Sequence, residues 1–124
     1  MTKNIIFSPD APAAIGPYSQ AVEVNGTLYV SGQIALAAFE AGVSIEEETE
    51  QVMKNMGHIL TAAGYTYQNV VKCTIFVKDM GHFAQINAIY GSFFSDNFPA
   101  RETVEVARLP KDVRVEISCI AYKS

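Results

Sequence analysis

The amino-acid sequence predicts an α+β fold, with a mixed sheet of about six strands and two helices on one of its faces. Apolar residues recur at helical spacing in residues 44–64 and 79–93, whereas the other apolar stretches alternate with a period of two. The elements therefore follow the order β-β-β-α-β-α-β-β. Because no linker or repeat interrupts the 124 residues, we expect one domain over residues 1–124.

Three strands are expected in the N-terminal third of the chain. A short edge strand at residues 5–7 precedes a loop that is rich in proline and glycine. Asn25-Gly26 is a strong hairpin signal, because both residues tolerate positive φ and alternating residues flank them. Gly32, near the end of the second hairpin strand, indicates a bulge or the close approach of another group to the backbone.

The first helix is expected to begin after Ser44 and to end at Gly64. Ser44 and Glu47 have the spacing of a capping box, and Gly64 is typical of a left-handed C-terminal cap. The residues 35–42 before this helix are expected to form an apolar connection. The helix dipole favours negative charge in the first turns, and we interpret the acidic residues there as a solvated helix start. These residues are Glu46, Glu47, Glu48 and Glu50.

A strand at residues 70–78 and a second helix follow. Alternation places one set of side chains of this strand on a common face: Val71, Cys73, Ile75 and Val77. Asp79 is expected to cap the second helix. The apolar stripe of that helix consists of Phe83, Ile86, Tyr90 and Phe93. Asn87 lies beside the stripe, where a solvated or locally bonded side chain is favoured; the alternative is a side chain that reaches a site on the sheet.

The last two strands, joined by a turn at residues 109–112, each carry a charged residue among apolar ones. Alternation allows Arg101 and Glu116 to lie together on the sheet face away from the main core. An arginine can bind both oxygens of a carboxylate, and a glutamate can orient water or move a proton. The alternative is a structural ion pair between neighbouring strands, which these two residues taken alone favour.

The face of the sheet that the helices leave open is not purely polar, because Phe76 and Ile120 are expected on it. Hydrophobic residues make up 49% of the chain, and its mean hydropathy is +0.13. We therefore expect subunits to associate through this face.

Composition disfavours several classes of protein. The net charge of -4 does not suggest a nucleic-acid-binding face. No apolar stretch reaches the ~20 residues that span a bilayer, and the N-terminus lacks the features of a signal peptide, so we expect a cytoplasmic protein. Cys73 and Cys119 are interpreted as buried reduced thiols. His58 and His82 have no ligand spacing, so no metal site is expected.

Further candidates precede the first helix. Tyr18 follows Gly16-Pro17 and either offers its hydroxyl to a ligand or packs as a half-buried ring. Ser31-Gly32 supplies a hydroxyl and an unobstructed backbone N–H, or forms only a bulge.

Motifs along nearly the whole chain resemble the RidA family, also called YjgF/YER057c/UK114. The matching segments, in order, are Ile15-Gly16-Pro17-Tyr18-Ser19-Gln20, Ser31-Gly32-Gln33-Ile34, Ala62-Ala63-Gly64, Val70-Val71-Lys72, Phe76-Val77-Lys78-Asp79-Met80, Asn87-Ala88-Ile89-Tyr90, Pro99-Ala100-Arg101 and Val104 through Ile117. The resemblance implies a chorismate-mutase-like (bacillus-type) subunit and a homotrimer with clefts between subunits. It also implies hydrolysis of reactive enamine and imine intermediates, of the 2-aminoacrylate and 2-iminopropanoate type, to 2-oxo acids and ammonia without cofactor or metal.

The resemblance also implies roles for single residues. Arg101 would bind the substrate carboxylate, Glu116 would position the attacking water, and Tyr18 would complete the catalytic set. Substrate binding would be shared by Ser31, Gly32, Asn87 and Thr103. Two other functions are kept as alternatives: a regulatory module that binds a small carboxylate without turnover, and an endoribonuclease or translation inhibitor, which the acidic composition disfavours.

Some positions depart from the family pattern. Thr103 stands where many members have cysteine, Glu102 where the residue is usually small, and Glu48 where glutamine is common. The connection after Ile34, over residues 35–43, is shorter than usual and lacks the customary proline. These departures leave the expected site intact but put its substrate preference in question.

Overall fold

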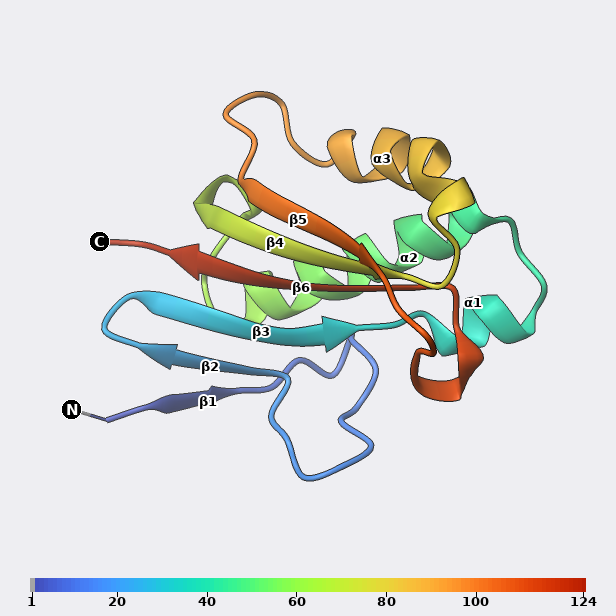
Figure 1. The fold of residues 1–124 in the computed structure, drawn as a ribbon. Helices are drawn as coiled ribbons and strands as arrows, with labels where there is room; N and C mark the ends of the chain where they lie inside the picture. Colours follow the sequence, from blue (N-terminus) through green and yellow to red (C-terminus); the bar gives the residue numbers. More distant parts are fainter. Residues whose placement is uncertain (1) are drawn as a thin grey trace.

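Residues 2–124, which the computed structural model describes, contain one six-stranded sheet in the order β1-β2-β3-β6-β4-β5 (Figure 1). Its strands are β1 (Asn4–Ile6), β2 (Ala21–Val24), β3 (Thr27–Gln33), β4 (Val70–Val77), β5 (Ala100–Glu105) and β6 (Val115–Tyr122). All neighbours are antiparallel except β4 and β5, which are parallel. The α+β class and the mixed six-stranded sheet are as predicted.

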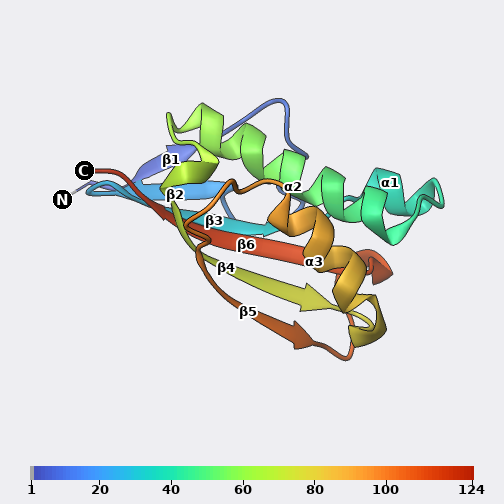
Figure 2. The ribbon, with the colours of Figure 1, turned by 90° about the horizontal axis from the view of Figure 1, so that it is seen from above.

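Three helices lie on the same face of this sheet (Figure 2): α1 (Leu36–Glu40), α2 (Ile45–Ala62) and α3 (Phe83–Gly91). Short 3-10 turns complete the chain at Tyr67–Asn69, Met80–His82 and Pro110–Asp112. The helix α1 was not predicted, because the Ala-rich stretch before α2 was interpreted as a connection. The opposite face, in front in Figure 1, carries no helix, and we call it the open face.

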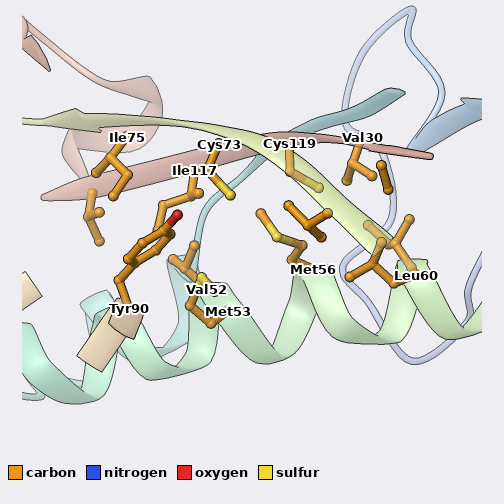
Figure 3. Packing of buried hydrophobic residues seen from close by; sticks show 14 of the residues in the cluster. Val30, Val52, Met53, Met56, Leu60, Cys73, Ile75, Tyr90, Ile117 and Cys119 are labelled. Atoms are coloured by element: carbon orange, nitrogen blue, oxygen red, sulfur yellow. The ribbon is translucent and has the colours of Figure 1, made fainter. Parts of the chain in front are cut away.

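The core lies between the sheet and α2 (Figure 3). From the sheet, Val30, Cys73, Ile75, Ile117 and Cys119 point toward the helix. The facing side chains of α2 are Val52, Met53, Met56 and Leu60, all 0–1% exposed. This apolar face is the one predicted from helical spacing.

The boundaries of α2 also agree with the sequence. The Ser44 hydroxyl accepts a hydrogen bond from the Glu47 N–H at 3.1 Å, and Gly64 has a φ of +81°. The acidic first turn, however, is not wholly solvated. Glu48 is completely buried, and its carboxylate accepts bonds from Nε of Arg114 at 2.6 Å and from the backbone N–H of Arg114 at 2.9 Å. Glu48 thus joins the start of α2 to the start of β6.

Small shifts separate other predicted elements from the observed ones. A register irregularity between Val70 and Lys72 leaves Val71 exposed rather than in the core row. Asp79 caps the 3-10 turn Met80–His82 instead of α3, since it accepts from the Gly81 N–H at 2.8 Å. The apolar stripe was predicted to end at Phe93, but α3 ends at Gly91, and beyond it Phe94 is more deeply buried than Phe93.

The prediction that the last two strands are neighbours is wrong. The strand β4 lies between β5 and β6, so the turn after β5 is part of a crossover and not of a hairpin. An ion pair between Arg101 and Glu116 on adjacent strands is therefore excluded by the order of the sheet.

Candidate active site

A cavity of about 380 Å³ on the open face brings together four of the predicted residues: Tyr18, Ser31, Gly32 and Glu116. Ile15, Ile34 and Pro110 complete its wall. Glu116 comes from β6 and pairs with Phe76 of β4, whose neighbours Ile75 and Val77 face the core. Because side chains alternate along a strand, Glu116 points to the open face.

Gly32 allows the carboxyl group of Glu116 to lie directly over the backbone of β3. The register of β3 against β6 shifts between Val30 and Gln33, which is the bulge that Gly32 predicted. A Cβ atom at Gly32 would lie 2.7 Å from Cδ of Glu116, and closer still to Oε2. Burial raises the pKa of Glu116 above its ordinary value of 4.5, which makes this carboxyl a stronger proton acceptor than a solvated one.

Tyr18 and Ser31 line the same cavity from the loop and from β3. The Tyr18 ring is 50% exposed, and its hydroxyl oxygen accepts a bond of 3.4 Å from the Ile15 N–H. The Ser31 hydroxyl donates to the carbonyl of Ser19 at 2.6 Å, which leaves its oxygen free to accept. The loop before β2 is thereby tied to the strand that carries Ser31.

Arg101 lies on the opposite, helix-covered side of the sheet. It pairs in register with the core residue Cys73, and its guanidinium donates a short hydrogen bond to Oδ1 of Asn87 in α3. The same guanidinium stacks over the rings of Phe83 and Tyr90, at 5.6 Å and 5.3 Å from their centroids. The prediction that Arg101 and Glu116 share the face away from the core is therefore wrong.

Asn87 adopts the alternative that sequence reasoning disfavoured, because it bonds a residue of the sheet rather than solvent or its own helix. The stacking partners Phe83 and Tyr90 were missed as functional residues. Their spacing from Asn87, four residues before and three after, was the available signal, since such positions share one face of a helix.

Thr103 is two residues from Arg101 along β5, on the same face. Its hydroxyl oxygen is buried and has no hydrogen-bond partner within the part of the chain that the structure describes. An unpaired buried hydroxyl is costly, which makes this atom available to a ligand. Glu102 points away from Arg101 as predicted, but the face it lies on is the open face and not the core side. Hydrogen bonds from Lys72 and Thr74 lower its pKa.

Two groups of residues are thus held on opposite faces of one chain. The cavity that contains Arg101 is lined by Asn87, Tyr90, Gly91, Phe98 and Pro99, and it shares no residue with the cavity of Glu116. Each group is built and oriented by its own elements: α3 and β5 for Arg101, β3 and β6 for Glu116.

The thiols contribute to packing. Cys73 and Cys119 are free, buried and opposite each other on β4 and β6, and burial raises the pKa of both. Among residues 2–124, no three His, Cys, Asp or Glu side chains gather as a metal site would require. None of the helices in that range combines the length and the apolar character needed to cross a bilayer.

The family model described as endoribonuclease L-PSP matches residues 8–123. The chain belongs to the RidA family. A human 2-iminobutanoate/2-iminopropanoate deaminase is 45% identical to this RidA-family chain, over 99% of the chain and 92% of the relative. A Lactococcus lactis protein named as a candidate regulator, AldR, is 52% identical over 95% of the chain and 96% of the relative.

Solved structures of RidA-family proteins have the same fold. The crystal structure of TdcF from E. coli with bound serine superposes with a TM-score of 0.91 at 38% identity, and covers 98% of this chain and 99% of that one. The subunit architecture implied by the sequence resemblance is thereby confirmed.

Proposed function

We propose that this protein hydrolyses reactive 2-imino and 2-enamino acids to 2-oxo acids and ammonia. The observation that carries the proposal is the Glu116 carboxyl, with a raised pKa, in a cavity that Tyr18 and Ser31 also line. Relatives 45% and 46% identical to this chain over nearly its whole length are named for such a reaction.

The chemistry requires little more than positioning. An imine carbon is already electrophilic, so water can add to it without a strong nucleophile. In the proposed reaction the oxygen of the water bonds to the imine carbon as the C=N π bond breaks, and Glu116 accepts a proton from this water and returns it to the nitrogen. In the resulting carbinolamine the hydroxyl proton passes through Glu116 to the nitrogen as the C–N bond breaks, and ammonia and the 2-oxo acid leave. One water is consumed for each ammonia released.

Arg101 is proposed to bind the substrate carboxylate. Its guanidinium is oriented by Asn87 and by two aromatic rings, so little side-chain freedom is lost on binding. Thr103 would add contacts from its backbone, together with its unpaired hydroxyl. Threonine at this position gives no thiol-based role, and the proposed mechanism uses none.

A site that needs both Arg101 and Glu116 is proposed to form between subunits of a homotrimer. The two residues lie on opposite faces of one chain, so a second copy must bring its Arg101 to the Glu116 cavity. The open face is apolar enough to be covered by another subunit, since Tyr29, Val104 and Tyr122 are 42–52% exposed on it.

The test is hydrolysis of an imine generated in the cuvette by an amino-acid oxidase or a dehydratase, in competition with semicarbazide, which traps the imine. We expect the protein to divert imine from the trap, and Arg101→Ala to lower kcat/KM by at least about a hundredfold. Arg108→Ala is the matched control, because Arg108 pairs only with the exposed Asp112 at 2.8 Å. An unchanged rate in Arg101→Ala would refute the assigned site.

A second candidate is a regulatory module that binds a small carboxylate without turnover. The 52% identity to the candidate regulator AldR favours it. In addition, serine is bound in the crystal structure of E. coli TdcF, so a relative of the same fold binds a small carboxylate. Calorimetric binding of a 2-oxo acid, with no imine hydrolysis above the uncatalysed rate, would establish this function instead.

RNA cleavage, the activity named by the matching family model, is disfavoured by the net charge of -4. If purified protein cleaves RNA and Arg101→Ala or Glu116→Gln leaves the cleavage unchanged, that activity belongs to a different site.

A further inference from the structure

A second cavity, of about 290 Å³, adjoins the cavity of Glu116. It lies between the loop before β2 and the helix α1. The two cavities share Ile15, Tyr18, Gly32 and Ile34, so one continues into the other. A small molecule bound beside Glu116 therefore has a partly open space next to it into which a substituent can extend.

The walls of this second cavity are apolar. Pro12 and Ala13 form one side, and Leu36 and Ala37 of α1 form the other. Two glutamines also line it, but their side chains are engaged elsewhere, as the distances of their hydrogen bonds show. Gln20 accepts from the Ser8 N–H at 2.7 Å and donates to the Pro12 carbonyl at 3.0 Å, and Gln33 donates to the Ser31 carbonyl at 3.0 Å. The space suits an apolar group rather than one that needs hydrogen bonds.

Glu40, at the end of α1, is the one charged side chain among the described residues that line the cavity, and no basic residue lines it. A carboxylate that entered this space would meet a like charge, and no basic residue of the lining would offset it. Glu40 is exposed, so solvent screens part of this repulsion. An uncharged group of the same length would meet no such repulsion.

Residues that line the cavity are tied to the rest of the fold by hydrogen bonds. Gln20, 4% exposed, bonds both Ser8 and Pro12 and so fixes the loop against the sheet. On the other side, Asn55 of α2 donates to the carbonyl of Ile34 at 3.1 Å, just before α1 begins. Because both walls are fixed, little ordering of the chain opposes binding.

We propose that this second cavity receives the side chain of the substrate, and that it selects 2-imino acids with apolar side chains of several carbons over those with acidic side chains. The proposal rests on the function proposed above and names its substrate class. Leu36 and Ala37 would set the length and shape of the accepted side chain, and Glu40 would reject a second carboxylate.

The test compares kcat/KM for imines made by one oxidase from alanine, leucine, methionine and glutamate. We expect the leucine-derived imine to exceed the alanine-derived one by about tenfold. The methionine-derived imine should exceed the glutamate-derived one, which has a similar length, by at least about tenfold. Equal values within either pair would overturn the corresponding part of the proposal.

Two substitutions on α1 test separately the preference for apolar side chains and the rejection of acidic ones. Ala37→Phe fills the cavity and is expected to bring the leucine-to-alanine ratio toward one. Glu40→Gln removes the charge and is expected to narrow the methionine-to-glutamate ratio about fivefold. Glu46→Gln is the matched control, since Glu46 is exposed in the first turn of α2 and does not line the cavity. Thermal unfolding checks that each variant is folded.

The experiment distinguishes an error about the second cavity from an error about the proposed function. If the alanine-derived imine is hydrolysed but the leucine-derived imine is hydrolysed no faster, the role of the second cavity is refuted and the function stands. If no imine is hydrolysed, the function fails, and calorimetry with 4-methyl-2-oxopentanoate and pyruvate decides the subsite. Tighter binding of the branched acid by the wild type but not by Ala37→Phe supports the proposal, and equal binding overturns it.

Discussion

Two inactive variants are expected to restore each other's activity when their subunits are mixed. Arg101→Ala removes the group proposed to bind the substrate carboxylate, and Glu116→Gln removes the proposed proton acceptor. Within one chain these residues lie on opposite faces of the sheet, held by separate elements. A complete site in the proposed homotrimer would thus combine Glu116 of one subunit with Arg101 of another.

The size of the restored activity follows from this arrangement. Consider trimers assembled at random from equal amounts of the two variants. A Glu116→Gln subunit still has Arg101, and an Arg101→Ala subunit still has Glu116. A site is therefore complete only when the first kind of subunit contributes Arg101 and the second kind contributes Glu116. Each condition holds half the time, so about one quarter of all sites are complete. Purification through both tags removes the unmixed trimers, and about one third of the sites in the mixed trimers that remain are complete. Each pure variant, by contrast, contains no complete site.

The assay uses co-expression of the two variants with different affinity tags, purification through both tags, and the semicarbazide competition described above. Native mass spectrometry gives the distribution of mixed trimers against which the rate is normalised. A rate no higher than that of the parent variants, in preparations that do contain mixed trimers, would refute the shared site. A monomeric mass for the wild type would refute the trimer itself.

Three further outcomes are expected. Gly32→Ala should lower kcat/KM by about a hundredfold with the fold retained by circular dichroism, because the new methyl group displaces the carboxyl of Glu116; an unchanged rate would contradict the close approach. Glu116→Gln should raise the melting temperature at pH 7, because burial raises the folded-state pKa of Glu116 and its ionisation therefore opposes folding above that pKa. The gain should vanish below a pH of about 4, where the carboxyl is protonated in both states, and a gain that persists there has another cause. Glu48→Ala should lower the free energy of unfolding in urea by about 3 kcal/mol, since it leaves Arg114 without its buried partner. Its control Glu50→Ala, on an exposed i,i+4 pair, should cost less than about 0.5 kcal/mol, and equal losses would contradict the structural role of Glu48.

Local signals in the sequence were sufficient for most of the elements, although not for α1. Asn25-Gly26 adopts the positive φ values of the predicted hairpin, and the bulge falls at Gly32. Both depend on the conformational limits of a few residues, which neighbouring residues do not change. That Tyr18, Ser31, Gly32 and Glu116 lie in one cavity was expected only through the family resemblance.

The position of Arg101 depends on contacts that alternation cannot reveal. Alternation correctly placed Arg101 and Thr103 on one face of their strand and Val104 on the other. The error was to assign the face of Val104 to the core. Val104 is instead 42% exposed on the open face, because this edge strand pairs in parallel with β4 and its core side receives Arg101. Alternation predicted an apolar side chain on the core side of this strand. Instead the Arg101 guanidinium lies there, covered by two aromatic rings of α3.

The burial of Glu48 has the same origin. A glutamate in the first turn of a helix is explained by the dipole alone. Glu48 does lie at helical spacing from the apolar Ile45 and Val52, but this spacing does not identify the cation that would pair with it. Its partner Arg114 lies 66 residues away and meets it only because β6 starts beside α2. Contacts of this kind depend on the order of the strands in the sheet, and the local patterns of one sequence do not reveal that order.

The opposite placement of Arg101 and Glu116 also accounts for the composition of the chain. A site shared between subunits requires the open face to be covered, and a covered face can carry tyrosine and valine without exposing them to solvent. In the proposed trimer, the high apolar fraction and the division of the site would both follow from one assembly. If Tyr29 and Val104 lie in that interface, replacing Val104 by aspartate should weaken both the trimer and the imine hydrolysis, although neither Arg101 nor Glu116 has been changed.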